Sequence, residues 1–463
     1  MTNSSSQTPP SGYYAPHQKV YPREVHGHYA RLRTAAVFTL LGLYYLLPWC
    51  QWNGRQAILF DLPARQFHLF SLVLWPQDFI FLTLLLIIAG LTLFFSTALA
   101  GRLWCGFACP QTVWTEVFLW MERRIEGDRA KRLKLDHAPW SLEKGLRKTG
   151  KQAAWLTFAG WTGLTFVGFF TPIRSLLPAA LSFTLGPWET FWSLFYGFAT
   201  YGNAGYMREQ VCKYMCPYAR FQSAMFDRDT LIITYDARRG EPRGSRPRGT
   251  PAQSRGQGDC IDCQACVQVC PTGIDIRHGL QYECIACAAC IDACDSVMDQ
   301  MQSPRGLIRY TTQQALDGKP TRLLRPRMLV YGAILALIML LFVVALSLRQ
   351  PLAMDVLRDR ATLYREVHDA NGRPWFENAY ELRVMNKDDV SHTYLLTVHG
   401  IPGIEVDARE TLLRAGPGEV ASIPVRLRVP AGEVHGSLAV QFTLHEVGKT
   451  QRQVTEPARF LAP

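Results

Sequence analysis

The chain alternates long apolar segments with segments rich in charge, and the apolar ones predict membrane-spanning helices. A helix needs about 20 apolar residues to cross a bilayer. Residues 79–100 and 328–348 meet this length without a charge, while residues 34–49 and 153–170 are slightly short but uncharged and rich in aromatics. Residues 191–207 form the weakest segment, because it contains glycine and asparagine, and a buried soluble helix is its alternative. We expect five spans.

The last part of the chain follows a different pattern, in which apolar and other residues alternate with the period of a half-buried β-strand. The clearest runs are Tyr380-Leu382-Val384, Val425-Leu427-Val429 and Leu438-Val440-Phe442-Leu444. Gly, Pro and Asp clusters separate these runs, which predicts a small β-sandwich of immunoglobulin type outside the membrane. The sandwich segment contains no cysteine, so we expect it to serve in docking or spacing rather than in chemistry.

The basic residues, which give a formal net charge of +11, gather in particular loops. Residues 101–152 and 208–257 are rich in Lys and Arg, whereas residues 50–78 contain only Arg55 and Arg65 and residues 171–186 only Arg174. Cytoplasmic loops carry such an excess, so the N-terminus is expected inside and the C-terminus outside. Membrane lipids are the expected partner of these charges. Nucleic acid is not, because no aromatic residues interleave with the charges.

Eight of the 13 cysteines form two tandem runs of the pattern C-x2-C-x2-C-x3-C. This spacing is typical of two [4Fe–4S] clusters, in which the fourth cysteine of each run ligates the other cluster. One cluster is then assigned Cys260, Cys263, Cys266 and Cys294, and the other Cys284, Cys287, Cys290 and Cys270. A disulfide-rich or zinc module is the alternative, but zinc sites usually separate two C-x2-C pairs by a longer stretch. The segment is predicted to be a two-cluster electron-transfer module.

Four further cysteines form two matched C-x3-C-P motifs, Cys105/Cys109 and Cys212/Cys216, after the second and fourth predicted spans. Cysteines at i and i+4 lie on one face of a helix, and the following proline is expected to end or kink that helix. Both motifs face the cytoplasm in the predicted topology, so together they predict a four-thiolate site. Soft thiolates suit Cu(I), Zn or an iron–sulfur centre. Buried apolar cysteines and a redox disulfide pair are the alternatives.

These patterns divide the chain into successive parts. We expect a cytoplasmic N-terminal tail at 1–33, a membrane domain at 34–207, a basic linker at 208–257, a ferredoxin-like module at 258–304, a second linker at 305–327, a fifth transmembrane helix at 328–348 and an outer β-domain at 349–463. The beginning of the tail is Ser/Pro-rich and is expected to be disordered. Residues 236–258 consist mostly of Arg, Gly, Pro and small polar residues, which is typical of a flexible solvated linker.

Several long motifs resemble the CcoG/FixG/RdxA family. They are GRLWCGFACPQTVWTE at 101–116, NAGYMREQVCKYMCPYARFQSAMFDRDTLI at 203–232 and the whole double cysteine run at 258–298. Similar motifs cover nearly all of the chain from Tyr21 onward, and all twelve cysteines of the runs and pairs match. The sequence departs from the expected pattern at two positions, and both departures are small. Asp295 follows Cys294 where ferredoxin runs have proline, and Ala361 stands where Asn is expected.

The resemblance implies a bacterial inner-membrane iron–sulfur protein that assists assembly of cbb3-type cytochrome c oxidase and reduces Cu(II) to Cu(I). Its clusters would be cytoplasmic and its immunoglobulin-like C-terminal domain periplasmic. The implied catalytic and copper-binding residues are Cys105, Cys109, Cys212 and Cys216. Oxidase assembly components, copper transporters or chaperones and a cytoplasmic electron donor are the implied partners.

Two other functions fit the same residues. The first is a membrane electron conduit of quinol or ferredoxin type, without a metal substrate of its own, although no haem motif such as C-x2-C-H is present. The second is a non-enzymatic assembly scaffold or copper chaperone that acts through the outer β-domain. Paired clusters argue against the scaffold as the whole function, because a scaffold needs no electron transfer.

Overall fold

The computed structural model describes residues 19–250, 256–322, 324–350, 352–359, 362–368, 372–388, 390–408, 412–432, 434–448 and 453–463. The Ser/Pro-rich start of the tail, residues 251–255 of the expected linker and Ala361 lie outside these ranges. The chain forms two compact units. The first comprises Met1–Leu47, Ile87–Val167 and Leu176–Leu337, and the second Pro48–Leu86, Gly168–Ser175 and Ile338–Pro463.

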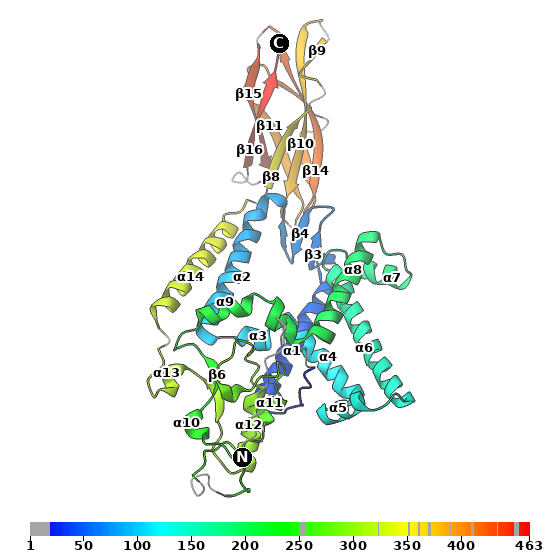
Figure 1. The fold of residues 1–463 in the computed structure, drawn as a ribbon. Coiled ribbons are helices and arrows are strands. Elements are labelled where there is room, and N and C mark those ends of the chain that lie inside the picture. Colours follow the sequence, from blue (N-terminus) through cyan, green and yellow to red (C-terminus); the bar gives the residue numbers. More distant parts are fainter. Residues whose placement is uncertain are drawn as a thin grey trace, which may run out of the picture. The chain divides into compact units, whose positions relative to one another are not determined.

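Three helices among the described residues are long and apolar enough to cross a membrane: His28–Trp49, Phe79–Ala100 and Pro326–Ser347. They match three of the five predicted spans, and they comprise α1 (His28–Leu46) with the turn after it, α2 (Phe79–Ala100) and α14 (Pro326–Ser347). Helices α2 and α14 lie side by side (Figure 1), where the rings of Phe81 and Phe342 are 6.1 Å apart.

The other two predicted spans are helical but are not among those three. Residues 153–170 fall largely in α6 (Leu142–Val167), whose first half is charged. Residues 191–207 are shared between α8 (Pro187–Thr200) and the π-helix η3 (Tyr201–Met207). α6 and α8 pack closely, because a Cβ added to Gly163 would lie 2.1 Å from the carbonyl oxygen of Ser193. The glycine therefore allows the two backbones to meet.

The first unit is mainly helical. Its remaining helices are α3 (Leu103–Phe107), α4 (Pro110–Glu126), α5 (Arg129–His137), α7 (Ile173–Leu181), which the second unit shares, η4 (Val211–Met215), α9 (Tyr218–Met225), α10 (Ala237–Gly240), α11 (Ala265–Gln268), η6 (Ile276–His278), α12 (Ala289–Gln300) and α13 (Gln313–Leu316). Helix α1 begins at His28 because Asp292 of α12 accepts from the backbone N–H groups of Tyr29 and Ala30, at 3.2 and 2.7 Å. A carboxylate suits this position, since free N–H groups and the helix dipole favour negative charge there.

The described parts of the segments expected as linkers contain helices and strands, which corrects the expectation of a flexible linker there. Residues 208–257 contain η4, α9, β6 (Ile232–Tyr235) and α10, and β6 pairs antiparallel with β7 (Ile308–Thr311) from the second expected linker. The arginines are not simply solvated. Arg246 is buried and donates to the carbonyl of Gly258 at 2.6 Å, and Arg239 pairs with Asp259 at 2.5 Å. Their charges anchor this segment on the cysteine-bearing module.

A buried group of charges holds together the helices that lie between the two C-x3-C-P motifs. Glu122 of α4 is fully buried and contacts Arg132 at 3.0 Å, Arg208 at 2.9 Å and Lys151 at 3.6 Å. Arg132 also donates to the carbonyl of Pro22 at 2.6 Å, which binds the N-terminal segment to the same group. Because buried charges are costly unless they are paired, these contacts fix the relative positions of α4, α5, α6 and the chain before Cys212.

The second unit contains two antiparallel sheets that form a β-sandwich. One has the order β12-β14-β10-β8 with β9 also paired to β10, and the other has the order β13-β11-β15-β16. The strands are β8 (Leu352–Arg358), β9 (Arg365–His368), β10 (Pro374–Asn386), β11 (His392–His399), β12 (Glu405–Ala408), β13 (Leu412–Ala415), β14 (Val420–Pro430), β15 (Ser437–Glu446) and β16 (Gln453–Leu461).

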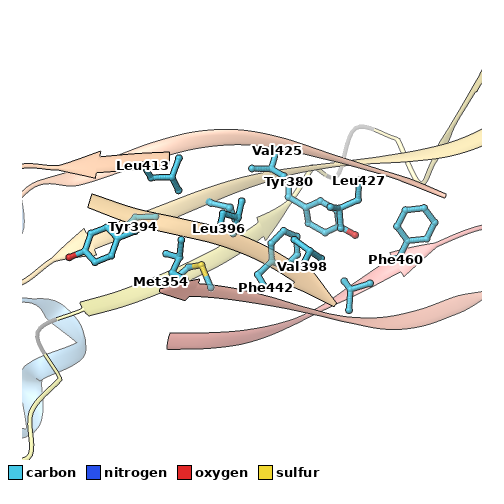
Figure 2. Close-up of a cluster of buried hydrophobic side chains, with 14 of the residues drawn as sticks. Met354, Tyr380, Tyr394, Leu396, Val398, Leu413, Val425, Leu427, Phe442 and Phe460 are labelled. Carbon is cyan, nitrogen blue, oxygen red and sulfur yellow. The ribbon is translucent and has the colours of Figure 1, made fainter. Parts of the chain in front are cut away.

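The predicted alternation is confirmed in the sandwich core. Tyr380, Leu382 and Val384 of β10 are buried, as are Val425, Leu427 and Val429 of β14. Figure 2 shows Tyr380, Leu427 and Phe442 directed into the space between the sheets, and the rings of Tyr380 and Phe442 are 5.1 Å apart. Every second residue of a strand points to the same face of its sheet. Because apolar residues occupy these inward positions on both sheets, the core between them is apolar.

A small β-region precedes the sandwich in this unit. It consists of the pair β1 (Gln51–Trp52) and β2 (Arg55–Gln56) and the sheet β3 (Ile58–Asp61), β4 (Gln66–Leu69) and β5 (Leu72–Leu74). Asp78 is buried and contacts Arg349 at 2.7 Å and Lys387 at 3.2 Å. These ion pairs tie the start of α2 to the beginning of the sandwich.

Candidate functional site

The two cysteine runs share a backbone conformation that winds each loop around a small space. Asp262 and Gln264 in the first run have φ of 54° and 56°, and Ala286 and Ala288 occupy the same positions in the second run with φ of 55° and 61°. Left-handed conformations are costly for residues other than glycine, and they persist where a site requires them. A helix begins at the same point inside each run, α11 after Gln264 and α12 after Ala288. The repeat in sequence is therefore a repeat in structure.

Each set of four cysteines that is predicted to bind one cluster lines one cavity. Cys260, Cys263, Cys266 and Cys294 line one small cavity, together with Arg277. Cys270, Cys284, Cys287 and Cys290 line a second small cavity. Cys266 reaches both cavities, so the two sites are adjacent. The arrangement places the fourth cysteine of each run with the first three of the other run.

Without a metal, the environment of these thiols favours their neutral form. Burial and the neighbouring thiols raise the pKa of Cys294 to about 12. Burial likewise raises the pKa of Cys284 to about 12, although the backbone N–H of Ala286 acts in the opposite direction. A coordinating metal reverses this preference, since it deprotonates a bound thiol outright. Four soft sulfurs around each cavity are the donors that an iron–sulfur cluster takes.

The two cavities differ in their access to solvent. Cys263 is exposed, whereas none of the cysteines assigned to the second cavity is exposed. Arg277 lines the first cavity and pairs with Asp262 and with Asp275, the latter at 2.6 Å. The first set of ligands is therefore the more accessible to a soluble electron donor.

The C-x3-C-P motifs do not place both cysteines on one helix face, which corrects the prediction from their spacing. Cys105 lies in α3, but Cys109 is extended, with φ −60° and ψ 128°, and precedes α4. Cys212 lies in the π-helix η4, and Cys216 is also extended, with φ −80° and ψ 111°. The prolines explain this difference, because a residue before proline favours the extended region and proline suits the start of a helix.

The four cysteines of these motifs nevertheless gather at one place. Burial raises the pKa of Cys212 to about 12, and the thiols of Cys109, Cys105 and Cys216 add to the effect. Burial also raises the pKa of Cys105 to about 11, with contributions from Cys109 and Cys216. Thiols influence each other in this way only when they are close, because the interaction falls with distance. We call Cys105, Cys109, Cys212 and Cys216 the four-thiol site.

The four-thiol site is gathered but not closed around a single ion. Over the ranges that the structure describes, no three His, Cys, Asp or Glu side chains are arranged to bind one metal ion. Metal–sulfur distances in thiolate sites are about 2.3 Å. A single ion at this site would therefore draw the sulfurs closer together.

The four-thiol site lies against the second cysteine run. Cys105 and Cys212 pack on a buried group that includes Ile285 and Cys287. Gly106 is required at this contact, since an added Cβ would lie 2.6 Å from the carbonyl oxygen of Ala286. The backbone between Cys105 and Cys109 thus touches the backbone between Cys284 and Cys287, and no side chain separates them.

Two arginines, the buried Arg102 and the partly buried Arg33, bind the carbonyls of the second run at this contact. Arg102 is 5% exposed and donates to the carbonyls of Tyr282 and Cys284, the latter at 3.0 Å, and to Ala219 at 2.6 Å. Arg33 donates to the carbonyl of Cys287 at 3.2 Å and approaches Glu116 to 3.7 Å. Burial would raise the pKa of Glu116, but Arg33 and Arg123 outweigh it and lower that pKa. The positive charges of Arg102 and Arg33 would partly compensate the negative charge of cysteine thiolates.

Sequence reasoning missed Gly106, Arg102, the Arg33–Glu116 pair and Gln222, a buried residue whose Oε1 accepts from the thiol of Cys105 at 3.4 Å. Gly106 and Arg102 lie inside the motif GRLWCGFACP, so their nearness to Cys105 was a usable signal. Arg33 and Glu116 are 83 positions apart in the chain, and Gln222 lies in a segment expected to be a linker. No local pattern relates these residues to the cysteines.

Three family models match the chain. Residues 207–313 match a "4Fe-4S dicluster domain", residues 81–127 a "4Fe-4S binding domain", and residues 342–463 an "IG-like fold at C-terminal of FixG". The dicluster match contains both tandem runs and Cys212 and Cys216, and the second match contains Cys105 and Cys109. These matches support iron–sulfur clusters as cofactors of this chain.

Curated relatives match along most of the chain. "Protein RdxB" of Cereibacter sphaeroides is 40% identical over 438 residues, covering 92% of this chain and 89% of its own. "Nitrogen fixation protein FixG" of Rhizobium meliloti is 37% identical over 464 residues, covering 90% and 88%. "Protein RdxA" of Cereibacter sphaeroides is 41% identical, covering 84% of each chain. A crystal structure of a FixG-related protein from Vibrio parahaemolyticus covers 24% of this chain and 97% of its own, at 25% identity and a TM-score of 0.21.

Proposed function

This chain belongs to the CcoG/FixG/RdxA family of iron–sulfur proteins, and from that premise we propose that it is a membrane-bound oxidoreductase that reduces Cu(II) to Cu(I). The observation that carries the proposal is the contact between the four-thiol site and the second cysteine run. A one-electron donor and a set of soft metal ligands are then neighbours. This arrangement suits a metal ion that changes its preferred ligands on reduction.

We assign Cys260, Cys263, Cys266 and Cys294 as ligands of one [4Fe–4S] cluster and Cys270, Cys284, Cys287 and Cys290 as ligands of the other. When bound, the two clusters supply one-electron transfer at low potential. The exposed Cys263 makes the first set the side for the electron donor, and the second set faces the four-thiol site. Arg102 and Arg33 hold the second loop in place through its carbonyls.

The four-thiol site accounts for the fate of copper. Soft thiolates favour Cu(I) over Cu(II), whereas Cu(II) favours nitrogen and oxygen ligands. Cu(II) gains one electron, the resulting Cu(I) binds to Cys105, Cys109, Cys212 or Cys216, and each coordinating thiol releases a proton to solvent. The raised pKa values of Cys105 and Cys212 keep these thiols protonated at neutral pH until copper arrives.

The membrane arrangement is part of the proposal. Three apolar helices are candidates for spans, and α6 and the α8–η3 helix complete five in our topology. The cysteine-bearing module would then be cytoplasmic and the C-terminal sandwich periplasmic, in the bacterial inner membrane with its lipids as partners. Delivery of Cu(I) would serve assembly of cbb3-type cytochrome c oxidase, with copper transporters or chaperones and a cytoplasmic electron donor as further partners.

The test is steady-state formation of Cu(I), measured with a chromogenic chelator on detergent-purified protein supplied with an electron donor. Replacing Cys105, Cys109, Cys212 and Cys216 together with serine should reduce the rate to the cluster-independent background. Cys50→Ser is the matched control, because Cys50 is exposed and belongs to none of the motifs. A quadruple variant that retains its iron and reduces Cu(II) at the rate of wild type would refute the four-thiol site as the place of reduction.

A further inference from the structure

Part of the buried charge group around Glu122 lines a cavity that no step of the proposed reaction uses. The cavity has a volume of about 260 Å³, whereas a single water molecule needs only about 10–15 Å³. Lys19 and Tyr206 are the exposed residues of its lining, and the buried Trp155 forms one of its walls. The cavity is therefore large enough for a small molecule or a headgroup, and it opens between Lys19 and Tyr206.

Two buried polar groups of this lining lack hydrogen-bond partners. Arg208 is 8% exposed, and its Nε donates to Gly205 and its Nη2 to Glu122. Its Nη1 has no hydrogen-bond partner among the described residues. The same holds for Oε1 of the fully buried Glu122, from which the Lys151 ammonium is 3.6 Å away. Because such groups are costly without partners, a suitable ligand accepts from Arg208 and donates to Glu122.

The charges of the lining favour a ligand with one negative charge. Three cations and two carboxylates line the cavity, namely Lys19, Lys151, Arg208, Glu122 and Glu209. The further members of this group of ion pairs carry two positive and two negative charges and are Arg132, Lys148, Glu126 and Asp136. One positive charge is left in excess, and a buried charge is costly unless it is paired.

The cavity lies where α6 changes from charged to apolar. The charged residues of this helix end at Lys151, and residues 152–167 carry no charge. Lys151 and Trp155 line the cavity on either side of this boundary. In the proposed membrane arrangement α6 is a span, so the boundary lies at the height of the cytoplasmic lipid headgroups. Trp and Tyr are enriched at that height, as Trp155 and Tyr206 are here.

The backbone holds Arg208 at this cavity in a strained conformation. Arg208 has φ of 41° and follows directly on the π-helix η3. Residues other than glycine keep such conformations where a site requires them, and π-helical turns are frequent at functional sites. Gly205 in the same helix lets the Trp155 ring pack closely, since an added Cβ would lie 3.2 Å from it. The guanidinium and the aromatic wall are thus placed together, with the Arg208 Cζ 5.4 Å from the ring centre.

We propose that this cavity binds the headgroup of an anionic phospholipid that carries hydroxyl groups, such as phosphatidylglycerol. The phosphate accepts from Nη1 of Arg208 and pairs with the Lys19 ammonium, and a headgroup hydroxyl donates to Oε1 of Glu122. Basic pockets between membrane helices on the cytoplasmic side bind such headgroups. The inference rests on the proposed membrane arrangement and does not involve copper.

The lipid would also support the neighbouring redox site. Arg208 and Glu209 line a second cavity, to which Cys212 and Cys287 contribute on the other side. A headgroup bound to Arg208 would therefore hold the segment that leads into the four-thiol site.

The experiment measures lipid binding to the full chain, delipidated in a neutral detergent, by native mass spectrometry. The probes are phosphatidylglycerol, phosphatidylmethanol, which has the same charge but no headgroup hydroxyl, and phosphatidylcholine, which has no net charge. We expect saturable binding of one phosphatidylglycerol at this site, weaker binding of phosphatidylmethanol and no saturable binding of phosphatidylcholine. Equal binding of the three lipids would contradict the proposal.

Two variants locate the site. Arg208→Gln should weaken phosphatidylglycerol binding by about tenfold or more, because hydrogen bonds between charged groups are strong. Lys19→Gln should weaken it by about fivefold, the effect of one basic residue beside an anionic lipid. Lys319→Gln is the matched control, since Lys319 is exposed and does not line the cavity. Binding within about twofold of wild type in both Arg208→Gln and Lys19→Gln would overturn the site.

Further arms separate the source of the phosphate and the two proposals. Free glycerol 3-phosphate that displaces phosphatidylglycerol at equal concentration would show that the ligand is soluble, which contradicts a lipid site. Iron content and thermal unfolding without lipid report on folding, and Lys19→Gln decides the matter if Arg208→Gln does not fold. The quadruple serine variant should bind the lipid as wild type does, because no cysteine lines the cavity. A protein that reduces Cu(II) but binds no phosphatidylglycerol would refute this inference and leave the reductase standing.

Discussion

The cysteine-bearing region and the C-terminal sandwich are stabilised in different ways. Over the described residues, the sandwich packs twenty buried apolar and tyrosine side chains into one cluster, and a few polar residues such as Glu377 and Asn386 are buried as well. The cysteine-bearing region buries charged residues such as Arg102, Arg246 and Asp292, and it holds four residues other than glycine at positive φ within its two runs. Hydrophobic burial is the main stabilising contribution in the first region. The second adopts a conformation that polar anchors and metal ligands must hold in place.

The largest expected effect comes from removing one ligand of the second cluster. Cys287→Ser should remove about four of roughly eight iron atoms per chain, since each cluster holds four. Cu(II) reduction should fall by about 100-fold or more, because the ligands beside the four-thiol site are lost. Iron and sulfide analysis with EPR of the reduced protein checks the first result. An unchanged sandwich, seen by its far-ultraviolet β-signal, is the expected control.

The next effect tests the buried charges. Glu122→Gln leaves Arg132, Lys151 and Arg208 without their shared carboxylate, and breaking a buried pair costs about 3–5 kcal/mol. Burial would raise the pKa of Glu122, but the pKa is lowered because Arg208, Arg132 and Lys151 outweigh burial. Its contribution to stability is therefore complete above the unfolded pKa of about 4.3 and is lost as pH falls through the lower folded value.

Thermal unfolding measured from pH 7 down to about pH 3 checks this prediction. Wild type should lose more stability on acidification than Glu122→Gln, whose neutral amide does not titrate. Equal acid sensitivity of the two proteins would contradict the role of Glu122 as the shared carboxylate.

The corresponding change in the sandwich is Leu427→Ala. Leu427 is 0% exposed, and truncating a buried leucine costs about 2–5 kcal/mol. Unlike Glu122→Gln, this variant should show no additional acid sensitivity and should keep the wild-type iron content. Chemical unfolding followed by tryptophan fluorescence, with iron analysis of the folded fraction, tests both statements. Loss of iron in Leu427→Ala would show that the two regions do not fold independently.

A smaller effect is expected where the four-thiol site meets the second run. Gly106→Ala would place a methyl group 2.6 Å from the Ala286 carbonyl oxygen, so the two backbones must separate. We expect about tenfold slower Cu(II) reduction, since small displacements of reacting groups carry large costs in rate. The iron content should remain that of wild type. Gly145→Ala is the control, because nothing lies within 4 Å of its added Cβ.

The smallest effect concerns the start of α1. Asp292→Ala removes the carboxylate that accepts from Tyr29 and Ala30, and loss of such a cap costs about 1 kcal/mol. Asp292→Asn keeps an acceptor oxygen and should retain most of the stability. Unfolding temperatures of the two variants, measured side by side, check this order. An Asn variant as unstable as the Ala variant would show that charge, rather than hydrogen bonding, holds the helix end.

The sequence was most informative where one physical rule decides the structure. Strand alternation placed Tyr380, Leu427 and Phe442 in the core, and uninterrupted apolar length located three helices suitable for spans. Composition was misleading at residues 236–250, because Arg, Gly and Pro are typical of linkers. Here the arginines instead donate to groups in other segments, as Arg246 does to the carbonyl of Gly258 and the hydroxyl of Ser303.

At the candidate site too, the sequence predicted what a local rule determines and missed what depends on contacts between distant segments. Cysteine spacing predicted which four residues line each cavity. In the fold that such runs form, the fourth cysteine of each run lies with the first three of the other run. The helix rule failed at Cys109 and Cys216, since the prolines after them place both residues in extended backbone. Gln222 and the Arg33–Glu116 pair depend on contacts between distant segments, and no local pattern encodes such contacts.

The decisive measurement is a single anaerobic turnover. Protein whose clusters have been chemically reduced is mixed with Cu(II), cluster oxidation is followed by EPR, and Cu(I) is trapped with a specific chelator. We expect one Cu(I) for each electron that leaves the clusters, and loss of this reaction when Cys105, Cys109, Cys212 and Cys216 are replaced with serine. Clusters that stay reduced in the presence of Cu(II) would contradict the proposed reductase and direct the search to a partner protein as the electron acceptor.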